Sequence, residues 1–164
     1  MKKIFLLAFS LLYLYGLKLD SNLTDYFQKE NAFNQFGCKG ENISPYLFWS
    51  EAPKNTKSFV ITLYDIDAPN GWWHWIVANI PASVNALEEN ASMAKHLPKG
   101  AFELKNSYGT LGYGGPCPPK NDKAHRYIFT IYALDCIIKD KSRLFNTIAT
   151  HTLSKDSLIL LYKR

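Results

Sequence analysis

The chain has 164 residues, of which 47% are hydrophobic and 15% aromatic, and its formal net charge is +5 at pH 7. This length favours a single domain with a hydrophobic core. The lysines and arginines are scattered and form no dense basic stripe, which argues against a nucleic-acid-binding protein. The sequence has no heptad pattern and no internal repeat, which excludes coiled-coil and solenoid architectures.

The amino-terminal segment is typical of a secretory signal peptide. Lys2 and Lys3 give it a positive start, and residues 4–15 form an apolar run. This run is shorter than the ~20 apolar residues of a typical membrane-spanning helix. We therefore predict that residues 1–16 are removed and that residues 17–164 form an exported, periplasmic domain. The alternative is a protein anchored in the membrane through the apolar run.

Hydrophobic periodicity predicts the strands and helices that follow in chain order. Runs of β-branched and aromatic residues indicate strands, and apolar residues at helical spacing indicate helices. The third predicted strand is apolar almost throughout, which is typical of a strand buried on both faces. Strands are predicted at Leu17–Asp20, Tyr46–Ser50, Ser58–Tyr64, Trp73–Ile80, Gly100–Leu104, Arg126–Leu134 and Leu158–Tyr162, and helices at Asp25–Glu30 and Leu144–Leu153.

These elements indicate a mainly β protein with one or two short helices. No helical crossovers connect the three strongest predicted strands, which argues against a doubly wound parallel sheet. Residues 82–100 are small and polar and are expected to form a loop. A longer loop, rich in glycine and proline, is expected over residues 106–124. Loops of that length in a compact domain usually carry function.

Two histidines stand at the starts of predicted strands, next to loops that contain glycine and proline. They are His74 and His125. With the period of two of a strand, His74 should share a face with Ile76 and Ala78. A histidine at a strand mouth can contact a ligand, although each one taken alone is more often a hydrogen-bonded structural residue. Their matching positions favour a common site.

Two carboxyl groups follow the central predicted strand. Asp65 and Asp67 would carry like charges on one face of an extended chain, so each needs a partner, and His74, His125 and Arg126 are the candidates. We expect Asp65 to lie in the pocket, where a histidine contact would fix the ring tautomer and favour the charged imidazole. We expect Asp67 to cap a turn or to pair with Arg126.

The composition of the segment Gly114–Pro119 favours a loop that binds an anion. Glycine lets the backbone approach a ligand closely, proline stiffens the loop, and the remaining N–H groups could converge on an anion as a nest. The alternative is a rigid turn without a ligand. Trp72 is expected at the rim of the pocket. If a protonated histidine holds the anion, binding should weaken as the pH rises above about 6.5.

The three cysteines are Cys38, Cys117 and Cys136. Export would permit a disulfide, and Cys38 and Cys117 are the better pair because both lie in loops that contain glycine or proline. Three free thiols are the alternative, because connectivity cannot be deduced from sequence. The chain has no Cys-x-x-Cys and no metal-ligand spacing, so we predict neither a metal site nor a cofactor.

Five groups of residues form a specific pattern along the chain. They are Phe36–Cys38 with Gly40, Asn42 and Ser44–Pro45; Tyr64–Pro69; Trp72–Trp75 with Asn79–Pro81; Gly112–Pro119; and His125–Tyr127 with Tyr132–Asp135. In this order the chain resembles the phosphatidylethanolamine-binding protein family, and within it the bacterial Raf kinase inhibitor-like branch. The segment 31–35 departs from the family pattern, so the first loop is expected to differ.

The resemblance implies a large central antiparallel sheet packed with a smaller sheet, and few short helices. It also implies a pocket for phosphate, acetate or a phospholipid headgroup. The polar groups would be Asp65, His74 and His125, the backbone wall would be Gly115, Pro116 and Cys117, and Pro69 and Tyr127 would complete the pocket. The long carboxy-terminal helix of eukaryotic members is not expected, so their kinase-inhibitor role is not carried over.

Together these observations predict an exported, non-catalytic protein that binds the phosphate or carboxylate group of a metabolite or phospholipid. Once processed it would contact a membrane without spanning it, and a homodimer is plausible. One alternative is an interaction protein that regulates a protease or a kinase. The other is a weak hydrolase that uses Cys117 beside His125, as Cys–His pairs do. Against this last alternative, Cys117 lies between two prolines and no third group is evident to orient it.

Overall fold

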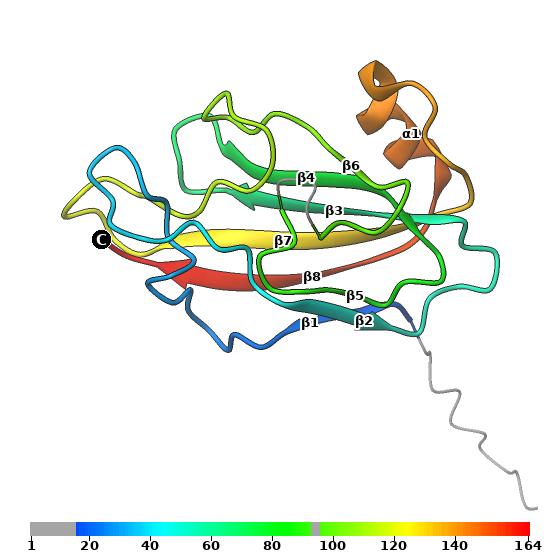
Figure 1. Ribbon diagram of the computed structural model, residues 1–164, viewed down its shortest axis with the longest axis horizontal. Helices are drawn as coiled ribbons and strands as arrows, with labels where there is room; N and C mark the ends of the chain where they lie inside the picture. The colour runs from blue at the N-terminus through cyan, green and yellow to red at the C-terminus, as the bar shows by residue number, and fades with distance from the viewer. Residues whose placement is uncertain (1–15, 93–95) are drawn as a thin grey trace, which may run out of the picture.

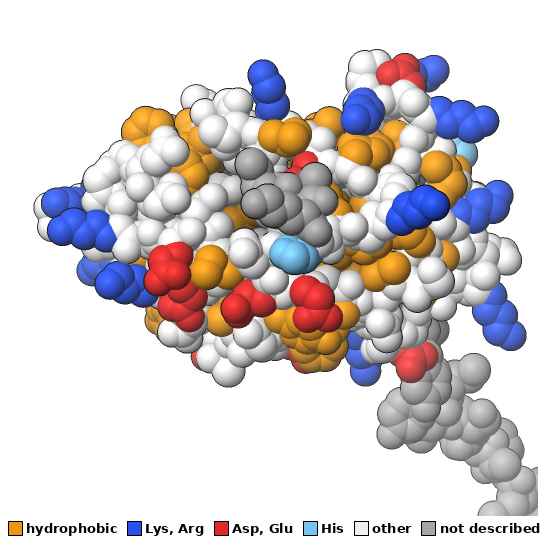
Figure 2. Space-filling view, viewed as in Figure 1, with side chains coloured by type: hydrophobic (Ala, Val, Ile, Leu, Met, Phe, Trp, Pro, Cys, Tyr) orange, Lys and Arg blue, Asp and Glu red, His pale blue; other side chains and the backbone are white. Residues whose placement is uncertain are grey.

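The computed structural model describes residues 16–92 and 96–164. The predicted signal peptide therefore lies, apart from its last residue, outside the described residues. Within the described ranges, no helix is long and apolar enough to cross a bilayer. On the face shown in Figure 2, lysine and arginine side chains are spread toward the edges and form no dense stripe, whereas most acidic side chains lie in the lower middle.

Two antiparallel sheets build the fold (Figure 1). The large sheet has the strand order β6-β4-β3-β7-β8, and the small sheet has the order β1-β2-β5. This arrangement confirms the predicted fold class. The strands are β1 Lys18–Ser21, β2 Leu47–Ser50, β3 Ser58–Asp65, β4 Trp72–Pro81, β5 Ala86–Leu87, β6 Phe102–Glu103, β7 His125–Leu134 and β8 Thr152–Tyr162.

The core lies on both faces of β3. Phe59, Ile61 and Leu63 pack toward the small sheet, whereas Val60 packs on the opposite face against α1, Leu144–His151. All four side chains are at most 1% exposed. Full burial of an apolar side chain contributes about 1.5–3 kcal/mol. The apolar run that predicted this strand therefore reflects burial on both of its faces.

The predicted helix at Asp25–Glu30 is wrong, because the main chain there pairs with the edge strand β8. The Phe27 N–H donates to the Leu161 carbonyl over 3.0 Å, and the Leu161 N–H donates to the Asp25 carbonyl over 2.8 Å. Tyr26 forms an isolated bridge to the same residue of β8. Backbone groups bonded to a strand cannot also complete a helical turn.

Most predicted strand ends differ from the structure by one or two residues, and the largest difference is at β8, which starts at Thr152 where Leu158 was expected. Helix α1 is preceded by the 3-10 turn η1, Lys141–Arg143, and ends at His151, two residues before the predicted end. Strand β8 begins directly afterwards at Thr152, and its first half is polar with one face open to solvent. Pairing with β7 holds this half in place. The expected loop over residues 82–100 contains the short strand β5.

Three strand ends meet at one end of the large sheet, at the left of Figure 1. Asp65 is the last residue of β3, and it pairs with Trp72 of β4 on one side and with Tyr127 of β7 on the other. His125 is the first residue of β7. The antiparallel order therefore brings residues of the β3–β4 hairpin together with residues of the distant strand β7.

Candidate functional site

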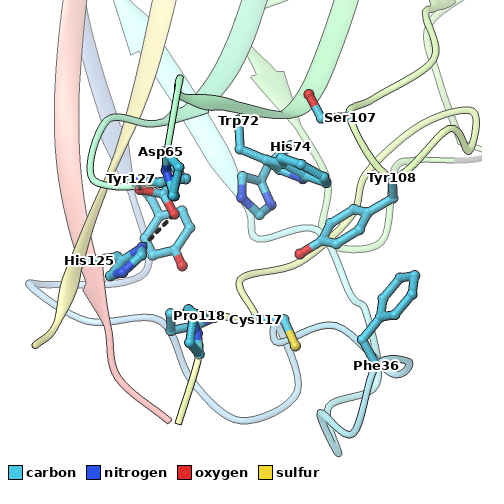
Figure 3. Close-up of a pocket in the computed structure, with 13 residues that line it drawn as sticks. Phe36, Asp65, Trp72, His74, Ser107, Tyr108, Cys117, Pro118, His125 and Tyr127 are labelled. Atoms are coloured by element: carbon cyan, nitrogen blue, oxygen red, sulfur yellow. Dashed lines mark hydrogen bonds and ion pairs between the residues drawn. The ribbon is translucent and has the colours of Figure 1, made fainter. Parts of the chain in front are cut away.

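A cavity of about 380 Å³ opens at this end of the large sheet (Figure 3). Its volume lies within the range of small-molecule sites. Aromatic rings and prolines form most of its wall, and two imidazoles and a carboxyl group lie among them. The lining residues are Phe36, Asp65, Ala68, Pro69, Trp72, His74, Ser107, Tyr108, Cys117, Pro118, Pro119, His125 and Tyr127.

Seven of the nine predicted pocket residues line this cavity, and Gly115 and Pro116 do not. These two lie behind the wall. The Gly115 carbonyl accepts a hydrogen bond from the Tyr108 hydroxyl over 3.1 Å. The Pro116 carbonyl accepts one from the Phe33 N–H, also over 3.1 Å. Both residues therefore support the lining.

Asp65 and His125 form a buried pair in the cavity, and each side chain is 4% exposed. Asp65 Oδ2 lies 2.8 Å from His125 Nδ1, which must donate because the carboxyl oxygen accepts. Asp65 Oδ1 accepts from the N–H groups of Asp67 and Ala68 over 2.8 and 3.1 Å. The same carboxyl group thus orients the imidazole and shapes the loop after β3.

Asp67 pairs with Arg126 outside the cavity, as expected. Its carboxyl oxygens accept from Nε and Nη2 of Arg126, each over 2.9 Å, and from the Arg126 N–H over 2.8 Å. The guanidinium holds the pKa of the Asp67 carboxyl well below its usual range. Asp67 therefore clamps the loop to β7 and does not line the site.

His74 lies at a β-bulge in β4. Its two neighbours in the chain pair with the consecutive residues Leu63 and Tyr64 of β3, so no residue of β3 stands opposite His74. A bulge bends the strand and re-aims its side chains. The bulge accounts for the direction in which the imidazole points.

The expectation that His74 shares a face with Ile76 and Ala78 is wrong. His74 contacts Tyr127 on the side of the small sheet, with 5.1 Å between the ring centroids. Ile76 and Ala78 pack on the opposite side with the residues that contact α1. Strict alternation fails because the bulge adds one residue to the strand.

The His74 imidazole is a hydrogen-bond acceptor toward the cavity. Its Nδ1 lies 2.6 Å from the Gly114 carbonyl, so Nδ1 donates and Nε2 of the neutral ring carries a lone pair. Burial lowers the pKa of His74 to about 4. The ring is therefore uncharged near neutral pH, and a positive charge for an anion at that pH cannot come from His74.

The buried His74 should make the fold less stable as the pH falls from about 6.5 to about 4. The unfolded chain binds a proton at this imidazole below about 6.5, whereas the folded protein binds it only below about 4. Over the whole window the effect is on the order of 3 kcal/mol. Urea unfolding at about pH 7.5 and about pH 4.5 measures the loss of stability. Both pH values lie above the usual pKa of aspartate, which limits the contribution of the aspartates to the difference. His74→Gln should reduce the loss, whereas His151→Gln, at an exposed position, should not. Equal losses in all three proteins would contradict the prediction.

The predicted anion nest is wrong at Gly114 and Gly115, because both N–H groups are used within the protein. The Gly114 N–H donates to the His74 carbonyl over 2.8 Å, and the Gly115 N–H donates to Asn42 Oδ1 over 2.7 Å. A Cβ on Gly115 would collide with the main chain at Asn31. Glycine is needed at this position for close packing of two loops.

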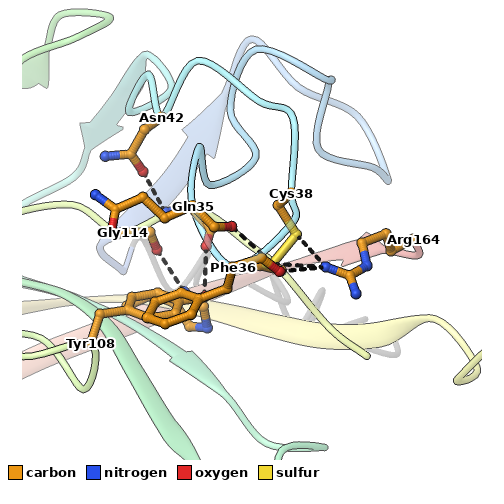
Figure 4. The surroundings of a disulfide bond; sticks show 10 residues. Gln35, Phe36, Cys38, Asn42, Tyr108, Gly114 and Arg164 are labelled. Atoms are coloured by element: carbon orange, nitrogen blue, oxygen red, sulfur yellow. Dashed lines mark hydrogen bonds between the residues drawn. A yellow bond between two sulfur atoms is a disulfide. The ribbon is translucent and has the colours of Figure 1, made fainter. Parts of the chain in front are cut away.

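Cys38 and Cys117 form a disulfide with 6.0 Å between their Cα atoms, as predicted (Figure 4). Cys136 is free. Within the disulfide Cys117 has no thiol, so it cannot act as the nucleophile of the hydrolase alternative. Arg164 reinforces this junction, because its Nη1 donates to the Phe36 carbonyl over 3.1 Å and lies 3.1 Å from Cys38 Sγ.

Sequence reasoning missed the aromatic mouth of the cavity. The rings of Phe33, Phe36 and Tyr108 are stacked, with 4.1 Å between the centroids of Phe33 and Tyr108 and 5.8 Å between those of Phe36 and Tyr108. Phe36 is 70% exposed and has a φ of 53°, a conformation that is uncommon for a bulky residue. These rings come from two loops far apart in the sequence. The motif around Phe36 marks one of these loops, but no sequence signal connects it with Tyr108.

Tyr127 lies between the two imidazoles. Its ring centroid is 5.1 Å from that of His74 and 6.4 Å from that of His125. Its hydroxyl is buried and, within the described part of the chain, has no hydrogen-bond partner, and the same holds for Trp72 Nε1. Burial raises the pKa of Tyr127, and the nearby Asp65 carboxylate raises it further, which keeps the hydroxyl protonated. The site thus combines unpaired donors with the acceptor on His74.

Comparison with known proteins gives one family. Residues 24–163 match the model of the phosphatidylethanolamine-binding protein family. The UPF0098 protein YbcL of Escherichia coli (strain K12) is 51% identical over 108 residues, which are 63% of this chain and 59% of that protein, less than two thirds of its length. A UPF0098 protein of Methanothermobacter thermautotrophicus is 42% identical over 149 residues, 83% of this chain and 97% of that protein.

Two solved structures have the same fold. The crystal structure of E. coli YbcL, reported as a new member of the mammalian PEBP family, superposes with a TM-score of 0.83 at 36% identity and covers 90% of this chain and 98% of that one. The putative phosphatidylethanolamine-binding protein homologue CT736 of Chlamydia trachomatis superposes with a TM-score of 0.76 at 31% identity, covering 92% and 99% of the two chains.

Proposed function

Because this chain belongs to the phosphatidylethanolamine-binding protein family, we propose that it is an exported binding protein whose cavity holds the phosphate or carboxylate group of a lipid or metabolite. The observation that carries the proposal is the buried Tyr127 hydroxyl, which lies between two imidazoles without a partner in the described chain. Buried donors almost always have an acceptor. A ligand oxygen would provide one.

The hydrogen-bonding groups favour a ligand that both accepts and donates. Tyr127 and Trp72 offer donors, whereas Nε2 of the neutral His74 offers a lone pair. A partly protonated phosphate, or a carboxyl group next to a hydroxyl, meets both requirements. Asp65 holds the His125 ring in place and is already bonded through both oxygens. Each of these four residues thus has a proposed role in holding the ligand.

The rest of the ligand would lie against the aromatic mouth. Phe36 and Tyr108 line the cavity on the side opposite His125, and Pro118 lies nearer to His125 (Figure 3). Ligand sites usually combine such apolar walls with a few polar groups that fix orientation. An acidic group with an attached apolar or glycerol-like portion therefore fits better than a free inorganic ion.

The disulfide supports two parts of the proposal, export and a non-catalytic role. Cys38–Cys117 is a type of bond that persists in oxidising compartments such as the periplasm. It also occupies the sulfur that a Cys–His hydrolase would need as its thiolate. Both points favour a binding protein outside the cytoplasm.

Tyr127→Phe tests the proposal because it removes one oxygen and keeps the ring. We expect the affinity for phosphate-containing probes to fall about tenfold, which corresponds to about 1.4 kcal/mol for one lost hydrogen bond. The free energy of unfolding should stay unchanged or rise by up to about 1 kcal/mol, since the hydroxyl has no partner in the described fold. Calorimetric titration with inorganic phosphate, O-phosphoethanolamine and acetate, alongside urea unfolding, measures both quantities.

Tyr132→Phe is the matched control, since Tyr132 lies on the same strand but packs toward α1. It should leave the affinity unchanged. If none of the three probes binds to the wild-type protein, or if Tyr127→Phe binds them as tightly as the wild type does, the proposal is wrong. Native mass spectrometry of protein purified from its own host would then show whether a protein partner occupies this face instead.

A further inference from the structure

Three side chains of different chemistry meet at the opposite end of the large sheet from the cavity. Asp135 and Cys136 follow β7, and His151 is the last residue of α1 (Figure 1). One ligand atom from each lies within 4.8 Å of the others. Among residues 16–92 and 96–164, no other group of three histidine, cysteine or acidic side chains meets so closely. We propose that Asp135, Cys136 and His151 bind a divalent transition-metal ion, with Zn²⁺ as the best match.

The types of ligand select the metal. A carboxylate oxygen, a thiolate sulfur and an imidazole nitrogen are the groups that Zn²⁺ binds in proteins. Mg²⁺ and Ca²⁺ prefer oxygen alone, so the sulfur and nitrogen argue against them. In a tetrahedral zinc site the ligand atoms lie roughly 3.3–3.7 Å apart. Here Asp135 Oδ1 and His151 Nδ1 are 2.8 Å apart, and all three atoms lie within 4.8 Å, so small side-chain rotations reach that geometry.

A main-chain hydrogen bond holds Asp135 and His151 together, and a bond from a serine hydroxyl fixes the main chain at Cys136. The Asp135 N–H donates to the His151 carbonyl over 3.2 Å. The Cys136 carbonyl accepts from the Ser58 hydroxyl over 2.6 Å. Leu134 and Thr152, each next to one of the three, pair across β7 and β8. The site is therefore built into the frame of the sheet, and an ion would bind with little reorganisation.

A second cavity gives the site access and room for a fourth ligand. It has a volume of about 320 Å³ and is lined by Cys136, His151, Asp140 and Arg143, among others. Three protein ligands leave one position for water or another small ligand. The cationic Arg143 and Lys139 line the same cavity, and Asp140 offsets part of their charge, so an anionic fourth ligand is favoured. The carboxy-terminal end of α1 at His151 adds a partial negative charge that favours a cation.

The sequence does not predict this site, because no short motif contains it. Cys136 and His151 are far apart along the chain, and their spacing matches no zinc pattern. Cys136 is the cysteine left over by the disulfide, and it is half-buried. An unpaired thiol in an exported protein otherwise pairs between molecules or reacts, whereas a metal would hold it as a thiolate.

A titration with Co²⁺, followed by competition with Zn²⁺, tests the proposal on the whole, disulfide-bonded protein. We expect one ion per chain and a thiolate-to-cobalt charge-transfer absorption. Cys136→Ser should abolish that absorption. Cys136→Ser and His151→Gln should each weaken Zn²⁺ binding by at least about tenfold, because even outer-shell changes cost that much. Both substitutions are conservative at half-exposed positions, and circular dichroism would verify that the fold is kept.

His96→Gln is the matched control, because His96 is exposed and lies outside the cluster. It should change neither the absorption nor the affinity. Absence of saturable binding would overturn the proposal. So would binding that is equally strong in Cys136→Ser and His151→Gln, or a thiol assay showing that Cys136 of the native protein is already consumed in an intermolecular disulfide.

Discussion

Asp65→Ala should lower the free energy of unfolding by about 3–5 kcal/mol, the cost of removing one partner from a buried pair. Three hydrogen bonds end on this carboxyl group: one from His125 Nδ1 and two from the N–H groups of Asp67 and Ala68. The substitution leaves the buried His125 donor and the two partly buried loop N–H groups without this acceptor. Ligand binding should be lost as well, because the His125 ring is no longer oriented. Urea unfolding at neutral pH measures the first effect, and calorimetry with O-phosphoethanolamine measures the second.

Asp122→Ala is the matched control for this prediction. Its Oδ2 lies 3.5 Å from the other nitrogen of the same imidazole, but its side chain is 51% exposed. An exposed pair of this kind contributes at most about 1 kcal/mol. Asp65→Asn separates the bonds to the loop from the bond to His125. The amide oxygen can still accept from the loop N–H groups, while the amide nitrogen faces His125. Similar stability losses in Asp65→Ala and Asp122→Ala would show that the buried pair is not what holds this end of the sheet.

Replacing both Cys38 and Cys117 by serine should lower the free energy of unfolding by about 3–4 kcal/mol. The two residues are 79 positions apart, so the bond removes much of the entropy of the unfolded chain. The midpoint of thermal unfolding should fall by roughly 10 °C. The bond also ties together two loops that line the cavity, through Phe36 on one and Cys117 on the other. We therefore expect weaker binding of phosphate-containing probes in the double variant.

A reducing agent should reproduce these losses in the wild-type protein and have no effect on the double variant. Cys136→Ser is the control, since Cys136 takes no part in the disulfide. If the double variant is as stable as the wild type, chain entropy does not govern this loop, and native-state contacts such as those of Arg164 hold it closed instead.

The central strands could be predicted from the sequence because burial on both faces leaves an unbroken apolar run. Ser58–Asp65 is the clearest case, with Phe59 and Val60 pointing to opposite sides of the sheet. The first half of β8 lacks such a signal, because one of its faces is open to solvent and pairing with β7 holds it. The segment Asp25–Glu30 contains no proline or glycine that would exclude a helix, but its backbone bonds to a distant strand.

The polar residues of the site could be predicted because they stand where buried strands begin or end. Asp65 and His125 are the clearest examples, and the disulfide could be proposed from the loops that contain its cysteines. The direction of His74 could not be predicted, since the bulge depends on the register between β3 and β4. The contact between Phe36 and Tyr108 depends on how two loops cross, and no periodicity within either loop encodes it.

The order of strands in the large sheet has a consequence for how fast the chain folds. β3 and β4 form a local hairpin, and β7 and β8 are neighbours in the chain, but β3 and β7 pair only after the intervening segment has closed as a loop. Closing such a loop costs entropy before its contacts form. Proteins with β-rich topologies therefore fold slowly, in milliseconds to seconds. Until that step the apolar β3 has a free edge, which makes this strand prone to aggregate in a newly made chain.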